Sequence, residues 1–148
     1  MSRVRDFLKG EGRDGAGRTI AEILAFRPEA LERHHDYIQW LFPLPDPSLA
    51  VPGSPVLDPA DITAIRASAL ARANLERGAA LMTAFYEETA AWLRPADHNH
   101  LRITRIIRSL RLLIGDEAAD RFRDAILRRA DGAAAPINPV SRAYWLAA

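Results

Sequence analysis

Proline and glycine residues divide this chain of 148 residues into segments whose apolar side chains recur at helical spacing. Residues 10–17 are rich in glycine, residues 43–47 hold three prolines, and Pro95 and Gly115 close later segments. Between these breaks apolar residues recur every three or four positions, which is typical of helices, and no run alternates as a strand would. The sequence therefore predicts an all-α fold.

We expect one compact domain over residues 1–148, because 49% of the chain is apolar and its length is that of one domain. About six or seven helices are predicted, over residues 3–9, 19–27, 29–42, 58–93, 116–130 and 140–146, and from a cap at Asp97 or Asn99 to Gly115. Asp58 is the expected cap of the helix over residues 58–93. The longest segment leaves open a break near Asn74 or Gly78. Because prolines cannot continue a helix, a proline-rich extended segment should follow the second main helix, as far as Pro55.

Composition excludes several classes of protein. The chain has no cysteine, which rules out disulfides and thiolate chemistry and suits a cytoplasmic protein. No signal-like or transmembrane run is visible, since about 18 to 20 apolar residues would be needed to span a bilayer. The net charge of +1 disfavours nucleic acid as a partner unless a local patch supplies the charge. Lys9 is the only lysine, and this bias with the many alanines is typical of a GC-rich bacterial genome.

The segment HHDYIQWLF predicts a central helix, since it is apolar on nearly all sides. Its rings are more typical of a core than of a cofactor site. His35 and Gln39 are four residues apart and could pair with each other or with buried backbone groups. The alternative is that His35 is a ligand or a proton carrier.

The segment LRITRIIRSLRLLIG predicts an amphipathic helix with arginine at every third position from 102 to 111. These arginines form a slanting band around the helix. The band could bind phosphate or carboxylate, or it could be a solvated face paired with acids. No aromatic residue interleaves with the arginines, which argues against single-stranded nucleic acid.

Metal and catalytic signatures are absent. The four histidines occur as two close pairs, but neighbours on a helix diverge and no HExxH pattern is present. We therefore predict no metal site and no cofactor, leaving open haem or a divalent metal on His35 or His98. Ser109 and Ser141 lack the GxSxG context, so we expect no catalytic residues and no enzyme.

Two blocks nonetheless resemble a known family. HDYIQWLFPLPDPS at residues 35–48 and HNHLRITRIIRSL at residues 98–110 are similar to tracts of the opioid growth factor receptor conserved region. Further similarity lies in GEGRDGAGRTIAEIL, in Leu31 and Glu32, and in LDPADI at residues 57–62.

This resemblance implies an all-helical, non-enzymatic binding module. The named animal member is a nucleus-associated receptor for met-enkephalin that restrains cell proliferation. The expected partner is a small anionic ligand, a peptide or a protein. We predict a joint site in which arginine fixes an anionic group, two amides orient it and an indole supplies apolar contact. Its residues are His35, Gln39, Trp40, His98, Asn99, Arg102 and Arg105. The same residues could instead form a buried polar network that ties two core helices.

Overall fold

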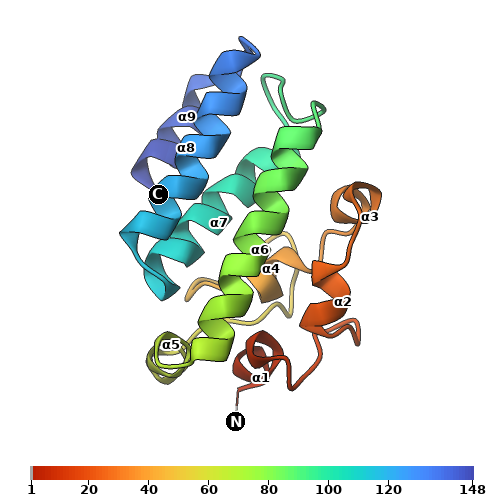
Figure 1. The fold of residues 1–148 in the computed structure, drawn as a ribbon, viewed down its shortest axis with the longest axis vertical. Coiled ribbons are helices and arrows are strands. Elements are labelled where there is room, and N and C mark those ends of the chain that lie inside the picture. The colour runs from red at the N-terminus through yellow and green to blue at the C-terminus, as the bar shows by residue number, and fades with distance from the viewer. Residues whose placement is uncertain (1) are drawn as a thin grey trace.

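A computed structural model describes residues 2–148, and these residues form nine helices and no strand (Figure 1). The all-α prediction is confirmed, with more helices than the six or seven expected. Their bounds are α1 Arg3–Lys9, α2 Ile20–Leu24, α3 Pro28–Arg33, α4 Ile38–Leu41, α5 Pro59–Arg66, α6 Ala69–Glu88, α7 His98–Leu113, α8 Asp116–Gly132 and α9 Pro139–Ala147.

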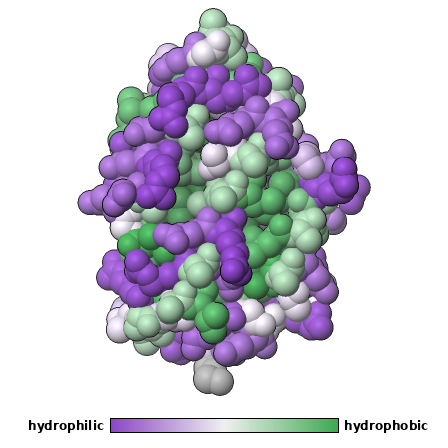
Figure 2. Space-filling model, viewed as in Figure 1, coloured by the Kyte–Doolittle hydropathy of each residue, from purple (hydrophilic) through white to green (hydrophobic). Residues whose placement is uncertain are grey.

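The long helices α6, α7 and α8 pack against one another and carry the rest of the fold. Helix α9 packs on α7, whereas α1 and α2 pack on α6 (Figure 1). Tyr86, Trp92 and Trp145 are fully buried between them. Figure 2 shows hydrophilic side chains over much of one face, with apolar residues in the hollows between them.

Local signals set most helix starts as predicted. Thr19 accepts a hydrogen bond from the backbone of Glu22 and forms a capping box that begins α2. Asp58 does the same for α5, with proline at the first helical position. Asp97 caps α7 by accepting from the Asn99 backbone N–H.

The predicted helix over residues 29–42 is wrong, because residues 34–37 separate α3 from α4. His34 is extended, with φ −82° and ψ 137°. The cause is tertiary: Arg102 of α7 donates to the carbonyls of Leu31 and His34, so α3 ends without needing further helical turns. The proline-rich segment therefore follows α4, and Leu57 N donates to Leu44 O across it at 3.0 Å.

The break in the predicted 58–93 helix lies at Ala67–Ser68 rather than near Asn74 or Gly78. Ser68 caps α6 by accepting from Ala71 N. Gly78 is inside α6, where a Cβ would lie 3.1 Å from two carbons of Leu41. Glycine there allows close packing of α4 on α6 and does not mark a break.

Within residues 2–148, none of the helices combines the length and the hydropathy that a bilayer-spanning helix needs.

Candidate ligand-binding groove

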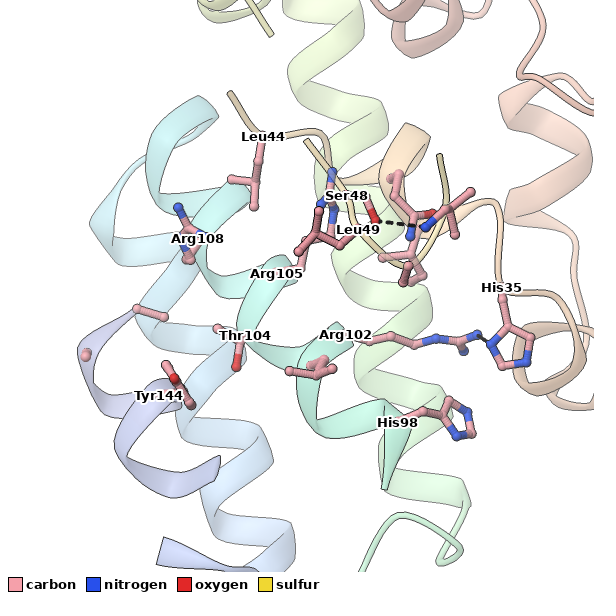
Figure 3. A pocket seen from close by; sticks show the side chains of 17 residues that line it. His35, Leu44, Ser48, Leu49, His98, Arg102, Thr104, Arg105, Arg108 and Tyr144 are labelled. Carbon is pink, nitrogen blue, oxygen red and sulfur yellow. Dashed lines mark hydrogen bonds between the residues drawn. The ribbon is translucent and has the colours of Figure 1, made fainter. Parts of the chain in front are cut away.

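A groove of about 950 Å³ runs along α7, between α9 and residues 44–51 (Figure 3). Its walls are mainly apolar, from Ile38, Leu44, Leu49, Leu101 and Tyr144. Three of these, Leu49, Leu101 and Tyr144, are 96%, 73% and 58% exposed. Clustered exposed apolar side chains mark binding surfaces more often than isolated ones do.

Arg102 closes one end of the groove and is saturated by protein acceptors. Nη1 donates to Leu31 O at 2.8 Å, and Nη2 donates to His34 O at 2.6 Å and to His35 Nδ1 at 3.1 Å. The guanidinium also lies 5.5 Å from the centre of the Tyr37 ring. Its charge thus ties α7 to the 31–37 segment, which matches the alternative of a buried polar network.

Arg105, one turn along α7, is not saturated. Its Nε donates to Phe42 O at 2.9 Å, but its buried Nη2 has no partner among residues 2–148. Burial, followed by repulsion from Arg108, lowers the pKa of Arg105 to about 10, whereas Asp46 opposes this shift. Asp46 is itself paired with Arg108 at 2.8 Å. The guanidinium remains charged at neutral pH and lacks a carboxylate partner within the described chain.

Gln39 lines the same groove from α4. Its side chain is only 7% exposed, and its Oε1 accepts no hydrogen bond from residues 2–148. Of the alternatives that the sequence left open for His35, the pair with Gln39 does not form, because His35 lies before α4 and turns to Arg102 (Figure 3). A buried acceptor without a donor is uncommon in folded proteins.

His35 and His98 meet at the end of the groove that Arg102 closes (Figure 3). Their ring centroids are 5.1 Å apart, and His98 Nε2 lies 3.3 Å from Glu32 Oε1. Burial first, then the charges of Arg102 and His98, lower the pKa of His35. No group of three potential ligands placed to hold a metal occurs within residues 2–148. The guanidinium on Nδ1 of His35 also makes this end of the groove unfavourable for a cation.

Two predicted site residues lie outside the groove. Trp40 packs edge to face on Phe7 and lies beneath Arg3, at 5.3 Å from the indole centre. Asn99 is buried, where its amide accepts from Tyr86 Oη at 3.0 Å and donates to Glu32 Oε2 at 3.0 Å. The structure therefore brings five of the seven predicted residues to one groove: His35, Gln39, His98, Arg102 and Arg105.

The arginine band on α7 divides between two roles: two arginines face inward to the groove and two form a solvated face paired with acids. Arg102 and Arg105 turn inward, whereas Arg108 pairs with Asp46 and Arg111 pairs with Asp116 and Asp120 at 2.9 and 2.7 Å. The outer two arginines are thus a solvated, acid-paired face. Helical spacing alone did not distinguish them.

Sequence reasoning missed the apolar walls. In the predicted C-terminal helix, Trp145 is buried, whereas the neighbouring Tyr144 is exposed. The four-residue spacing of Val140 and Tyr144, both exposed on α9, was the available signal for an apolar outer face. Leu49 lies in the proline-rich segment, where no periodicity could place it.

Comparison with known proteins gives one family. The family model for the opioid growth factor receptor conserved region matches residues 18–91. The mouse opioid growth factor receptor is 36% identical over 118 residues, which cover 68% of this chain and 18% of that protein. The rat protein is 36% identical and the human protein 30%, with 20% and 17% of their lengths covered. The chain thus spans a fifth or less of these relatives.

No solved structure matches the chain. The family match includes α2 to α6, with His35 and Gln39, while the groove arginines follow it on α7. The conserved region and the relatives agree, and this chain belongs to the opioid growth factor receptor family.

Proposed function

We propose that this domain is a non-enzymatic binding module whose groove takes an anionic ligand with an apolar body. The observation that carries the proposal is the partly buried cation of Arg105, which has no counter-ion in the described chain. Charges removed from water are normally paired, because desolvation of an isolated ion is costly. A carboxylate, sulfonate or phosphate group of a ligand would complete the pair.

Arg102 supplies an internal comparison. It is also buried and also lacks a carboxylate, but backbone carbonyls occupy both of its terminal nitrogens. Arg105 has a single carbonyl on Nε and an unmet Nη2. The two arginines lie on one helix, one turn apart, and they differ in their partners and in burial, since Arg102 is buried and Arg105 is partly buried. We therefore assign the anion to Arg105, with Arg102 holding the end of the groove in shape.

The groove suits binding better than chemistry. Its two aliphatic hydroxyls are engaged locally: Ser48 Oγ accepts from Val51 N at 3.3 Å, and Thr104 Oγ1 donates to the backbone carbonyl of His100 at 3.2 Å. Neither hydroxyl is hydrogen-bonded to an imidazole ring or a carboxylate that could act as its base. A volume of about 950 Å³ falls in the range of small-molecule sites, roughly 300–1,000 Å³. The mouse, rat and human relatives are named as receptors, which agrees with a binding role.

The test compares two fluorescent dyes of similar shape, anionic anilinonaphthalene sulfonate and neutral N-phenylnaphthylamine. The anionic dye should bind saturably, and Arg105→Met should weaken it at least about ten-fold, as expected for a charge-assisted hydrogen bond. The neutral dye should bind both proteins equally. Arg121→Met is the matched control, because Arg121 is exposed on α8 and outside the groove.

Equal loss of both dyes in Arg105→Met would indicate a collapsed groove instead of a lost anion contact. Unchanged affinity of the anionic dye in Arg105→Met would refute the proposal.

A further inference from the structure

Arg105 is not alone in the groove, since Gln39 also has a buried polar atom without a partner. Its amide is more than nine-tenths buried, and Oε1 can only accept a hydrogen bond. An anion satisfies Arg105 but repels a carbonyl oxygen. A ligand that meets both side chains must therefore carry an N–H or O–H donor in addition to its negative charge.

Gln39 and Arg105 reach the groove from neighbouring parts of the fold. Arg105 Nε is bound to Phe42 O at 2.9 Å, and Gln39 lies three residues before Phe42. Both side chains line the groove, Gln39 from α4 and Arg105 from α7. A ligand whose donor lies beside its anionic group meets both side chains with one end.

The rest of the groove offers apolar contact and few hydrogen bonds. Leu44, Leu49 and Tyr144 form its walls (Figure 3), together with Leu101. The backbone groups of α7 and α9 are used within those helices, and residues 2–148 contain no strand edge that could pair with an extended peptide. From His98 to Arg108 the α7 wall is about 15 Å long. An apolar chain fits such a surface, because it needs no hydrogen-bond partners.

We infer that the groove binds an amphipathic carboxylic acid that has an N–H donor beside its carboxylate, of the N-acyl amino acid class with a long acyl chain. This inference rests on the proposed function and names its ligand class. The carboxylate pairs with Arg105, the amide N–H donates to Gln39 Oε1, and the acyl chain lies along Leu101 and Tyr144.

The test uses three compounds that differ at one position each, measured by calorimetry below their micelle concentrations. N-dodecanoylglycine has the carboxylate and the N–H, N-dodecanoylsarcosine has a methyl group in place of that hydrogen, and N-dodecanoylglycinamide has lost the charge. The glycine conjugate should bind about five-fold more tightly than the sarcosine conjugate, which is the value of one neutral hydrogen bond. Both acids should bind at least about ten-fold more tightly than the amide.

Two variants test which side chain recognises the N–H group and which recognises the carboxylate. Gln39→Met keeps the size of the side chain and removes the acceptor, so the two acids should then bind equally. Arg105→Met should weaken both acids by the same factor and keep their ratio. Arg121→Met again serves as the control. Because the three compounds are first compared on the unaltered protein, a variant that fails to fold does not remove the test.

The outcomes separate this inference from the proposed function. Equal binding of the two acids, both tighter than the amide, overturns the inference and leaves the function standing. Equal binding of all three compounds overturns both. No saturable binding of any of them, while the anionic dye still depends on Arg105, overturns the inference alone. Tighter binding of an apolar hexapeptide with a free carboxyl terminus, which has the same N–H and carboxylate, overturns the acyl-chain assignment.

Discussion

The same substitution should change stability far more at Arg102 than at Arg105. Arg102→Met is expected to lower the free energy of unfolding by about 3–5 kcal/mol. Arg105→Met should change it by no more than about 1 kcal/mol, in either direction. Both residues are arginines with aliphatic stems packed on α7, so methionine preserves similar apolar contact at each position.

The larger effect follows from the contacts of Arg102. Its guanidinium donates to Leu31 O, His34 O and His35 Nδ1 at 2.8, 2.6 and 3.1 Å. Each hydrogen bond from a charged group is worth about 1.5–3 kcal/mol, although such values do not add in full within one network. Methionine would leave His34 O and His35 Nδ1 without this donor, whereas Leu31 O would keep the hydrogen bond from Tyr37 Oη at 2.6 Å, and the join between α3 and α7 would loosen.

The smaller effect follows from offsetting changes at Arg105. Methionine would remove one hydrogen bond, to Phe42 O, and would leave that carbonyl unmet at a cost of about 1–3 kcal/mol. It would also remove a buried, unpaired charge, and replacing buried charge with apolar groups is often neutral or stabilising by about 1–4 kcal/mol. The two terms are similar in size and opposite in sign.

Urea unfolding followed by circular dichroism measures both variants under one set of conditions. Arg102→Met should also lower Tm by about 10 °C, since about 1 kcal/mol corresponds to roughly 2–4 °C at this chain length. If Arg105→Met lost as much stability as Arg102→Met, Arg105 would be a structural residue. The unpaired Nη2 of Arg105 would then not indicate a missing anion.

Three further outcomes follow from single contacts. Gly78→Ala should cost about 1–3 kcal/mol in urea unfolding, because its Cβ would lie 3.1 Å from Leu41 carbons; a neutral result would contradict that packing. Trp40→Leu should lower Tm without changing affinity for the anionic dye, and a lost affinity would return Trp40 to the site. Burial first, and then Arg102, hold the pKa of His35 below its ordinary value, so stability should fall as pH drops below about 6.5. His35→Gln should reduce that fall in a Tm series against pH, and an identical series would refute it.

Features set by neighbouring residues could be predicted from the sequence. The capping boxes of α2 and α5 and the Asp97 cap of α7 require only side chains two or three residues away, so their patterns identified the helix starts. The end of α7 before Gly115 was equally local.

Features that depend on a residue far away in the sequence could not be predicted. Residues 34–37 leave the helix where Arg102 of α7 donates to the carbonyls of Leu31 and His34, and Arg102 is 68 residues from His34. A helical period cannot show that interaction. The direction of Trp40, which packs on α1 instead of facing the groove, depends in the same way on how α4 is docked.

The sequence by itself determined the helical class, most helix starts and the presence of an arginine band on one helix, because these follow from local periodicity and capping. Only the tertiary structure decided which arginines are inward and which of them found partners. Spacing of three residues on a helix distributes side chains around its axis, but the carbonyls near Arg102, the acids near Arg108 and the missing counter-ion at Arg105 come from other elements. Whether a charged side chain lacks a partner depends on how the elements pack, so the sequence of one segment does not predict it.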